Sequence, residues 1–76
     1  MDFQYVAGRN PVLEILRTDK EVEKIYIQKG ELQGSIKKII GIAKDKNIVI
    51  QEVDKSKLDS ITKGIAHQGV VALVTS

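Results

Sequence analysis

The chain has 76 residues, a formal net charge of +2 at pH 7 and no cysteine. This length predicts one small domain, and the lack of cysteine excludes a disulfide framework or a thiolate metal site and fits a cytoplasmic protein. Because the net charge is small, any affinity for nucleic acid would have to come from a local patch and would weaken with salt. No run approaches the roughly 18 apolar residues of a membrane span, and the first residues lack the pattern of a signal peptide.

The start of the chain predicts a strand followed by a helix. The apolar run at residues 5–7 stops at Gly8 and is typical of a short strand. Asn10 and Pro11 then predict a helix start, because an asparagine side chain can cap early backbone N–H groups and proline fits the first helical position.

A second strand and a longer helix are predicted next. Residues 24–28 have the β-branched and aromatic centre of a strand. Over residues 32–46 isoleucine recurs at helical spacing and the lysines fall largely elsewhere, so we expect an amphipathic helix with a solvated lysine face. Gly41 would fit a close packing contact in this helix. Asn47 is the expected terminator, since asparagine tolerates the left-handed conformation.

The last third of the chain predicts a strand at residues 48–53, a short helix over residues 55–61 with Asp54 as its N-cap, and a final strand. Residues 70–74 form an unbroken, valine-rich run, which indicates a strand buried on both faces in the middle of a sheet. A central strand so near the last residue leads us to expect a further segment after it. The whole alternation predicts a mainly parallel or mixed sheet with helices on both faces.

Two loops carry the candidate binding residues. Arg9 and Asn10 stand at the first strand-to-helix turn, where free N–H groups and the positive helix end favour a phosphate, and arginine adds a fork of donors. The loop before the last strand carries Lys63, His67 and Gln68, whose cation, imidazole and amide can contact phosphates, base edges or a ribose hydroxyl. These loops would lie close together if the first and last strands are neighbours, but the sequence leaves the strand directions open.

Several of these residues also have a structural interpretation. His67 could fix its loop by bonding a backbone carbonyl, or pack against another domain. A general base or metal ligand is less favoured, because the motif contains neither a carboxylate partner nor a second ligand. Gln68 could equally staple the loop, and Asn10 could act only as a helix cap.

Three segments together resemble a known family: Gly8-Arg9-Asn10-Pro11-Val12, Leu58-Asp59 and His67-Gln68-Gly69-Val70-Val71-Ala72. They are similar to the N-terminal substrate-binding domain of the SpoU (TrmH-type) RNA ribose 2'-O-methyltransferases. The resemblance implies a fold like that of the ribosomal L30-type and kink-turn-binding proteins, a three-layer α/β/α sandwich on a mixed four-stranded sheet. Residues 1–76 would then be a single RNA substrate-binding domain.

The resemblance also implies partners. Structured RNA, either rRNA or tRNA, would bind this domain, and a C-terminal knotted domain would bind S-adenosylmethionine and carry the catalytic residues. No catalytic residue, cofactor or metal ion is therefore expected within this chain, which we expect to be a monomer when isolated. Two alternatives stay open: a stand-alone kink-turn-type RNA-binding protein, and a domain whose loops dock on the catalytic domain rather than on RNA.

The aromatic content bears on how RNA would be held. Phe3, Tyr5 and Tyr26 are the only phenylalanine and tyrosine residues, and tryptophan is absent. Because single-stranded RNA is usually gripped by stacking bases on exposed rings, we expect recognition through RNA shape, phosphates and a few polar contacts instead.

Overall fold

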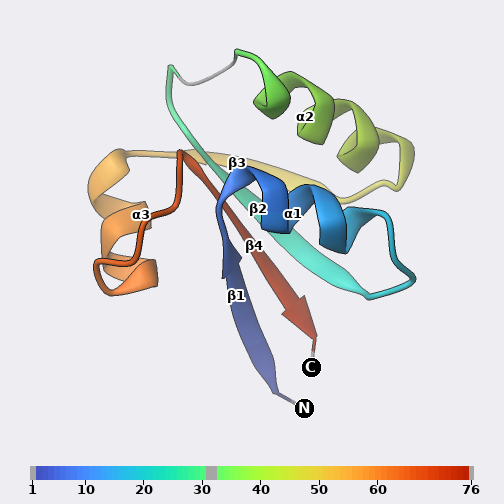
Figure 1. Cartoon of the computed structure of the whole chain (residues 1–76), viewed down its shortest axis with the longest axis horizontal. Helices are drawn as coiled ribbons and strands as arrows, with labels where there is room; N and C mark the ends of the chain where they lie inside the picture. Colours follow the sequence, from blue (N-terminus) through green and yellow to red (C-terminus); the bar gives the residue numbers. More distant parts are fainter. Residues whose placement is uncertain (1, 31–32, 76) are drawn as a thin grey trace.

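Figure 1 shows the computed structural model of the chain, which describes residues 2–30 and 33–75. Strands and helices alternate in the order β1 (Phe3–Ala7), α1 (Arg9–Leu16), β2 (Val22–Gln28), α2 (Ser35–Asp45), β3 (Val49–Val53), α3 (Lys55–Thr62) and β4 (Val70–Thr75). The predicted alternation is confirmed, with element ends shifted by a few residues.

The four strands form one mixed sheet in the order β1-β4-β2-β3. Strand β4 runs antiparallel to both of its neighbours, whereas β2 and β3 are parallel. Helices α1 and α2 cover one face of the sheet and α3 packs on the other (Figure 1). The predicted three-layer α/β/α sandwich on a mixed four-stranded sheet is therefore confirmed, while its likeness to the L30-type fold stays a prediction.

Strand β4 lies in the middle of the core, as its apolar run predicted. Val70, Ala72 and Val74 pack in the cluster beneath α1 and α2, whereas Val71 faces α3. The exposed fraction of all four is 0%. Both faces of β4 are thus covered, which holds the loop that leads into it at a fixed place.

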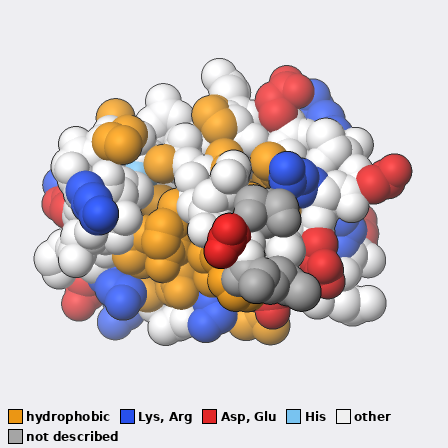
Figure 2. Space-filling view, turned by 90° about the horizontal axis from the view of Figure 1, so that it is seen from below, with side chains coloured by type: hydrophobic (Ala, Val, Ile, Leu, Met, Phe, Trp, Pro, Cys, Tyr) orange, Lys and Arg blue, Asp and Glu red, His pale blue; other side chains and the backbone are white. Residues whose placement is uncertain are grey.

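Helix α3 is 8 residues long and covers only part of its face of the sheet. Leu58 is fully buried there and Ile61 packs beside it, as their spacing predicted. Further along the same face, Phe3 and Tyr5 stay about half exposed. Figure 2, which views the molecule from the edge that carries both termini, shows hydrophobic side chains gathered in one continuous area of the surface.

The strand directions, which the sequence left open, bring four connections to one end of the sheet, where strands begin or finish. Strands β1, β2 and β3 end where β4 begins, because β4 alone runs in the opposite direction. We call this end of the sheet the rim; it consists of residues 8–9, 29–30, 54–55 and 67–69. The chain termini lie at the opposite end of the sheet, where Phe3 pairs with Thr75 (Figure 1). The two candidate loops therefore meet at the same end of the sheet.

The start of α1 differs from the prediction. The helix begins at Arg9 instead of after Asn10, and the capping position is held by Gly8, whose φ is 105° and which has no side-chain cap. Asn10 is exposed within the first turn. The local rule failed here because the acceptor that serves the first helical N–H comes from a distant loop, as described below.

The other helix ends agree in part with the prediction. Asn47 adopts a φ of 58° just after α2, as expected of a terminator. Asp54 occupies the capping position of α3, but its side chain makes no cap hydrogen bond. The expected packing contact at Gly41 is wrong, since a Cβ there would meet nothing within 4 Å. Helix α2 begins at Ser35, and residue 32, the predicted start, lies outside the described residues.

Candidate functional site

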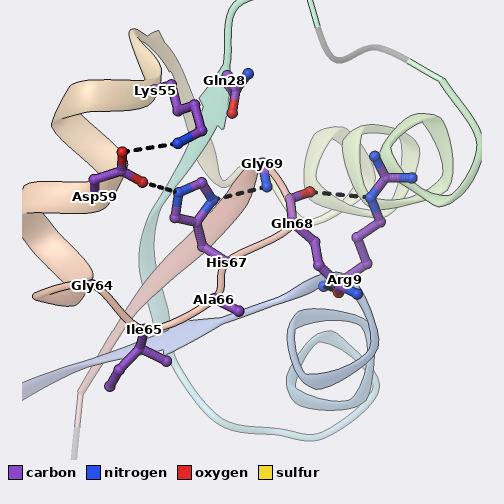
Figure 3. Close-up of a pocket in the computed structure, with 10 residues that line it drawn as sticks. All are labelled: Arg9, Gln28, Lys55, Asp59, Gly64, Ile65, Ala66, His67, Gln68 and Gly69. Carbon is purple, nitrogen blue, oxygen red and sulfur yellow. Dashed lines mark hydrogen bonds and ion pairs between the residues drawn. The ribbon is translucent and has the colours of Figure 1, made fainter.

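A cavity of about 500 Å³ opens beside the rim, between α3 and the loop that leads into β4 (Figure 3). Its wall is made by residues from β2, from the start of α1, from the first two turns of α3, and from that loop: Arg9, Gln28, Lys55, Asp59, Gly64, Ile65, Ala66, His67, Gln68 and Gly69. The cavity thus collects side chains from four separate parts of the chain.

His67 ties α3 to the start of β4 through both ring nitrogens. The N–H of Gly69 donates to Nδ1 at 3.0 Å, so Nδ1 carries no proton. The ring proton therefore resides on Nε2, which lies 2.7 Å from Oδ1 of Asp59 and donates to it (Figure 3). With an exposed fraction of 7%, His67 is almost completely buried. We call this pair of hydrogen bonds the His67 bridge.

Asp59 is the acidic end of the bridge. The hydrogen bond from His67, and after it the hydrogen bond from Lys55, lower the pKa of Asp59 below its ordinary value. Lys55 Nζ lies 3.0 Å from Asp59 Oδ2, one helical turn earlier in α3. Because these donors favour the ionised form, Asp59 is a carboxylate at neutral pH and holds both partners in place.

Gln68 connects the loop before β4 to the start of α1. Its side-chain oxygen accepts the backbone N–H of Arg9 at 2.8 Å, and its backbone carbonyl accepts from Arg9 Nε at 3.1 Å (Figure 3). We call this pair of contacts the Gln68 clamp. The clamp supplies the acceptor that a local capping side chain would otherwise provide at the first helical N–H.

The backbone of Gln68 is held in an unfavourable conformation. Gln68 and Gly69 have φ values of 52° and 82°, and the N–H of Val70 donates to the carbonyl of His67 at 3.0 Å. Positive φ at both central positions is the mark of a type I′ turn. A residue other than glycine in the left-handed region costs about 1–2 kcal/mol. The hydrogen bonds of Gln68 and its neighbours offset this strain. Strained backbone of this kind is found most often at functional sites.

Backbone hydrogen bonds complete the junction between the Arg9 turn and the loop before β4. The N–H of Gly8 donates to the carbonyl oxygen of Val70 at 3.1 Å, and the N–H of Gln28 donates to the carbonyl oxygen of Gly69 at 2.9 Å. The expectation of free N–H groups at this turn is therefore wrong for Gly8 and Arg9, because Val70 and Gln68 already accept from them.

The structure brings together three of the five predicted binding residues. Arg9, His67 and Gln68 line the same cavity. Lys63 ends α3 with a φ of 54° and lines a separate hollow, whereas Asn10 is exposed and lines neither. Three of the five residues therefore share one cavity, and their contact with RNA stays a prediction.

Two residues of the site were missed. Asp59 and Lys55 line the cavity, although neither was among the predicted binding residues. Their spacing of four on a predicted helix is a readable signal of an ion pair. The motif around His67 contains no carboxylate, and its carboxylate partner comes instead from α3, in the Leu58-Asp59 segment that carried the family resemblance.

The polar groups of the cavity differ in the partners that they already have. Both nitrogens of His67 have partners and the ring is buried, so the side chain fixes its loop. Its partners are a backbone N–H and a carboxylate, instead of the backbone carbonyl that the structural interpretation named. Within residues 2–30 and 33–75, no group of three His, Cys, Asp or Glu side chains could hold a metal ion. In that same part of the chain, no helix has the length and apolar character needed to cross a membrane. The cations on the cavity wall are the guanidinium of Arg9, whose Nε donates to the Gln68 carbonyl, and the ammonium of Lys55, which is paired with Asp59.

The described residues thus form a small α/β sandwich whose loops converge at one end of a mixed sheet. Comparison with known protein families finds a match that covers residues 5–76. It is the SpoU substrate-binding domain, described as RNA 2'-O ribose methyltransferase substrate binding. The chain belongs to this family.

Relatives agree with this assignment. YacO of Bacillus subtilis (strain 168), named for the TrmH family of tRNA/rRNA methyltransferases, is 39% identical over 72 residues, which cover 95% of this chain and 28% of YacO. A protein of the same description from Staphylococcus aureus (strain COL) is 40% identical over 74 residues, 97% of this chain and 29% of its own length. The chain thus spans less than a third of the length of these relatives.

Proposed function

We propose that this chain recognises RNA for a ribose 2'-O-methyltransferase that uses S-adenosylmethionine and acts on rRNA or tRNA in the cytoplasm. The family assignment supports RNA as the substrate, and the names of the relatives add methyl transfer to tRNA or rRNA. S-adenosylmethionine and the catalytic residues would belong to a catalytic domain of the parent protein. The domain itself would act as a monomer that positions the RNA.

The observation that carries this proposal is the junction at the rim. The Gln68 clamp and the His67 bridge fix the Arg9 turn and the loop before β4 as one surface. A surface that is already ordered loses less conformational entropy when a ligand binds. Phosphate contacts from fixed cations position an RNA without reading its sequence, as suits a domain that presents RNA to a separate catalytic site.

The charged groups define how the rim would meet RNA. Arg9 and Lys55 line the cavity, and Lys55 is paired with Asp59 at 3.0 Å. Lys29 belongs to the rim and lies 3.9 Å from Asp54. Arginine suits bidentate contact with phosphate, whereas lysine acts as a point charge. If two or three of these cations each neutralise one phosphate, the logarithm of the association constant should fall with the logarithm of salt concentration with a slope of about −1.8 to −2.7. His67 acts as a positioning residue, because its ring is buried behind the loop.

Two matched substitutions at the ends of α1 test this proposal. Arg9→Gln removes one charge at the rim, while Arg17→Gln removes the same charge just past the opposite end of the helix. Anisotropy titrations with fluorescent tRNA and an rRNA stem-loop should show that Arg9→Gln weakens binding about tenfold, and that Arg17→Gln changes it less than about twofold. Thermal unfolding of both variants checks the fold. Equal losses for the two folded variants would refute a localised site at the rim.

A further inference from the structure

The fold gathers all three phenylalanine and tyrosine side chains of the chain on one face of the sheet. Phe3 and Tyr5 alternate with their neighbours along β1, so they share the side on which Ala7 packs beneath α3. Tyr26, from β2, packs on the same side, and its ring centroid lies 6.5 Å from that of Tyr5. Helix α3 leaves this part of the face open, so Phe3 is 50% and Tyr5 48% exposed.

A hollow of about 340 Å³ lies next to Tyr5, between β1 and the end of α3. It is lined by Tyr5, Ala7, Ile61, Thr62, Lys63 and Ile65, and we call it the Tyr5 hollow. Its walls are mostly apolar, and Lys63 adds one ammonium group. Ile65 is 68% exposed, and with Tyr5 and Ile61 it makes an apolar patch around the hollow. A contiguous exposed patch, unlike a single exposed side chain, is typical of a binding surface.

The Tyr5 hollow adjoins the cavity beside the rim. Ile65 lines both, and only the loop of residues 63–68 separates them. In Figure 3 the side chain of Ile65 points away from His67, out of the cavity that His67 lines. A polynucleotide held at the rim would therefore pass within reach of the hollow.

We propose that the Tyr5 hollow receives one unpaired nucleobase of the RNA whose backbone is held at the rim. The base lies against the ring of Tyr5 and the side chain of Ile65, while Lys63 meets the adjoining phosphate. This inference rests on the proposed function and adds to it the kind of RNA that is bound: one with an unpaired nucleotide beside its folded part. It also assigns Lys63, which the rim cavity excludes, a role of its own.

The chemistry of the surface favours a nucleobase as the occupant. Proteins that hold single-stranded nucleic acid combine aromatic rings with cations that follow the backbone, and both are present here. Lys24 lies 5.5 Å from the ring centroid of Tyr26, so a second cation stands on the same face. Because every base has an aromatic face, such a hollow would accept an unpaired nucleotide with little preference for its identity. The sequence predicts recognition through RNA shape, phosphates and a few polar contacts, and this proposal adds one stacking contact because residues distant in sequence converge on one face.

Two variants of nearly equal exposure test the inference. Tyr5→Leu removes the ring from the hollow, and Phe3→Leu removes a ring from the same strand and face outside it. The probes are two RNAs with identical stems, one with a single 2-aminopurine bulge and one fully paired. Tyr5→Leu should weaken binding of the bulged RNA about tenfold and leave the paired RNA unchanged. Phe3→Leu should change neither by more than about twofold, and Tyr5→Phe should keep wild-type affinity because it keeps the ring.

The fluorescence of the bulged base gives a second measurement. In the wild-type complex it should be quenched by stacking, and in the Tyr5→Leu complex at saturation the quenching should disappear. Loss of affinity on Arg9→Gln without any effect of Tyr5→Leu would overturn this inference and leave the proposed function intact. Failure of the wild-type chain to bind either RNA would overturn both. If Tyr5→Leu instead loosened only the association with the catalytic domain, the face would be a protein contact and the inference would fall.

Discussion

Substitution of His67 tests whether its ring joins α3 to β4 by two separate hydrogen bonds. An asparagine places its side-chain oxygen near the position of Nδ1, so it can still accept from the Gly69 N–H without reaching Asp59. A glutamine places its amide nearer to Nε2, so it can keep the Asp59 contact and leaves the Gly69 N–H without an acceptor. Alanine loses both contacts.

The Gly69 N–H determines most of the expected loss. Gly69 is buried, and a buried donor left without an acceptor costs about 1–3 kcal/mol. The side chain of Asp59 is 47% exposed, so water can replace the imidazole there. With the lost packing of the ring, His67→Ala should lower the free energy of unfolding by about 2–4 kcal/mol. That is a large part of the roughly 4–11 kcal/mol expected for a domain of this length.

Thermal unfolding followed by circular dichroism measures the effect. His67→Ala should lower Tm by about 10–25 °C, His67→Asn should recover at least half of the loss, and His67→Gln should resemble alanine. A glutamine variant as stable as the wild type, beside an asparagine variant as weak as alanine, would show that the Asp59 contact dominates and would refute this reasoning. A loss below about 1 kcal/mol for alanine would refute the buried bridge itself.

Three further predictions concern the residues around this bridge. The folded protein lowers the pKa of Asp59, so the ionised carboxylate stabilises the fold at pH values above 3.8, the ordinary pKa of the group. This stabilisation is lost as the pH falls through the lowered pKa. Unfolding measured across an acid titration should therefore show Asp59→Asn less stable than the wild type at pH 7 and equal to it at low pH. Gly69→Ala should lower the free energy of unfolding by about 1–2 kcal/mol, since the φ of Gly69 is 82°, with Gly41→Ala, in open space within α2, as the neutral or stabilising control. Gln68→Gly and Gln68→Ala both remove the side chain of the clamp, but glycine also relieves the strain at a φ of 52°. Urea unfolding should therefore find the glycine variant more stable than the alanine variant by about 1 kcal/mol. Equal stabilities would contradict a strained turn.

The sequence could predict the layers because the signals for them are local. The unbroken apolar run of β4 indicates burial on both faces, whatever its neighbours are. The isoleucines of α2 recur at helical spacing, and Asn47 ends that helix in the left-handed conformation that its side chain tolerates. Each of these features depends on residues within one or two turns of the chain.

The site could be predicted only in part because its contacts join distant residues. Gln68 accepts from Arg9 across 59 positions. A capping rule for neighbouring residues cannot assign that acceptor, and it favours Asn10 instead. Nor does the sequence indicate that Gln68 adopts a positive φ, since glutamine rarely does. The bond between Asp59 and His67 spans 8 positions across a turn, beyond the reach of helical spacing.

The convergence of the aromatic side chains is a consequence of topology. Tyr5 and Tyr26 lie on strands that are not adjacent in the sheet, with β4 between them, and their rings meet across it. The amino-acid composition shows only that aromatic residues are few. The strand order places them together on the face that α3 leaves partly open.

Chemical-shift mapping of the isotope-labelled chain with a structured tRNA or rRNA fragment tests the central claim most directly. If RNA is held where the Arg9 turn meets the loop before β4, the largest amide shifts should fall on Arg9, Lys55 and Gln68, and they should diminish as salt is added. Shifts confined to the lysines of α2, with the rim amides unmoved, would contradict the account.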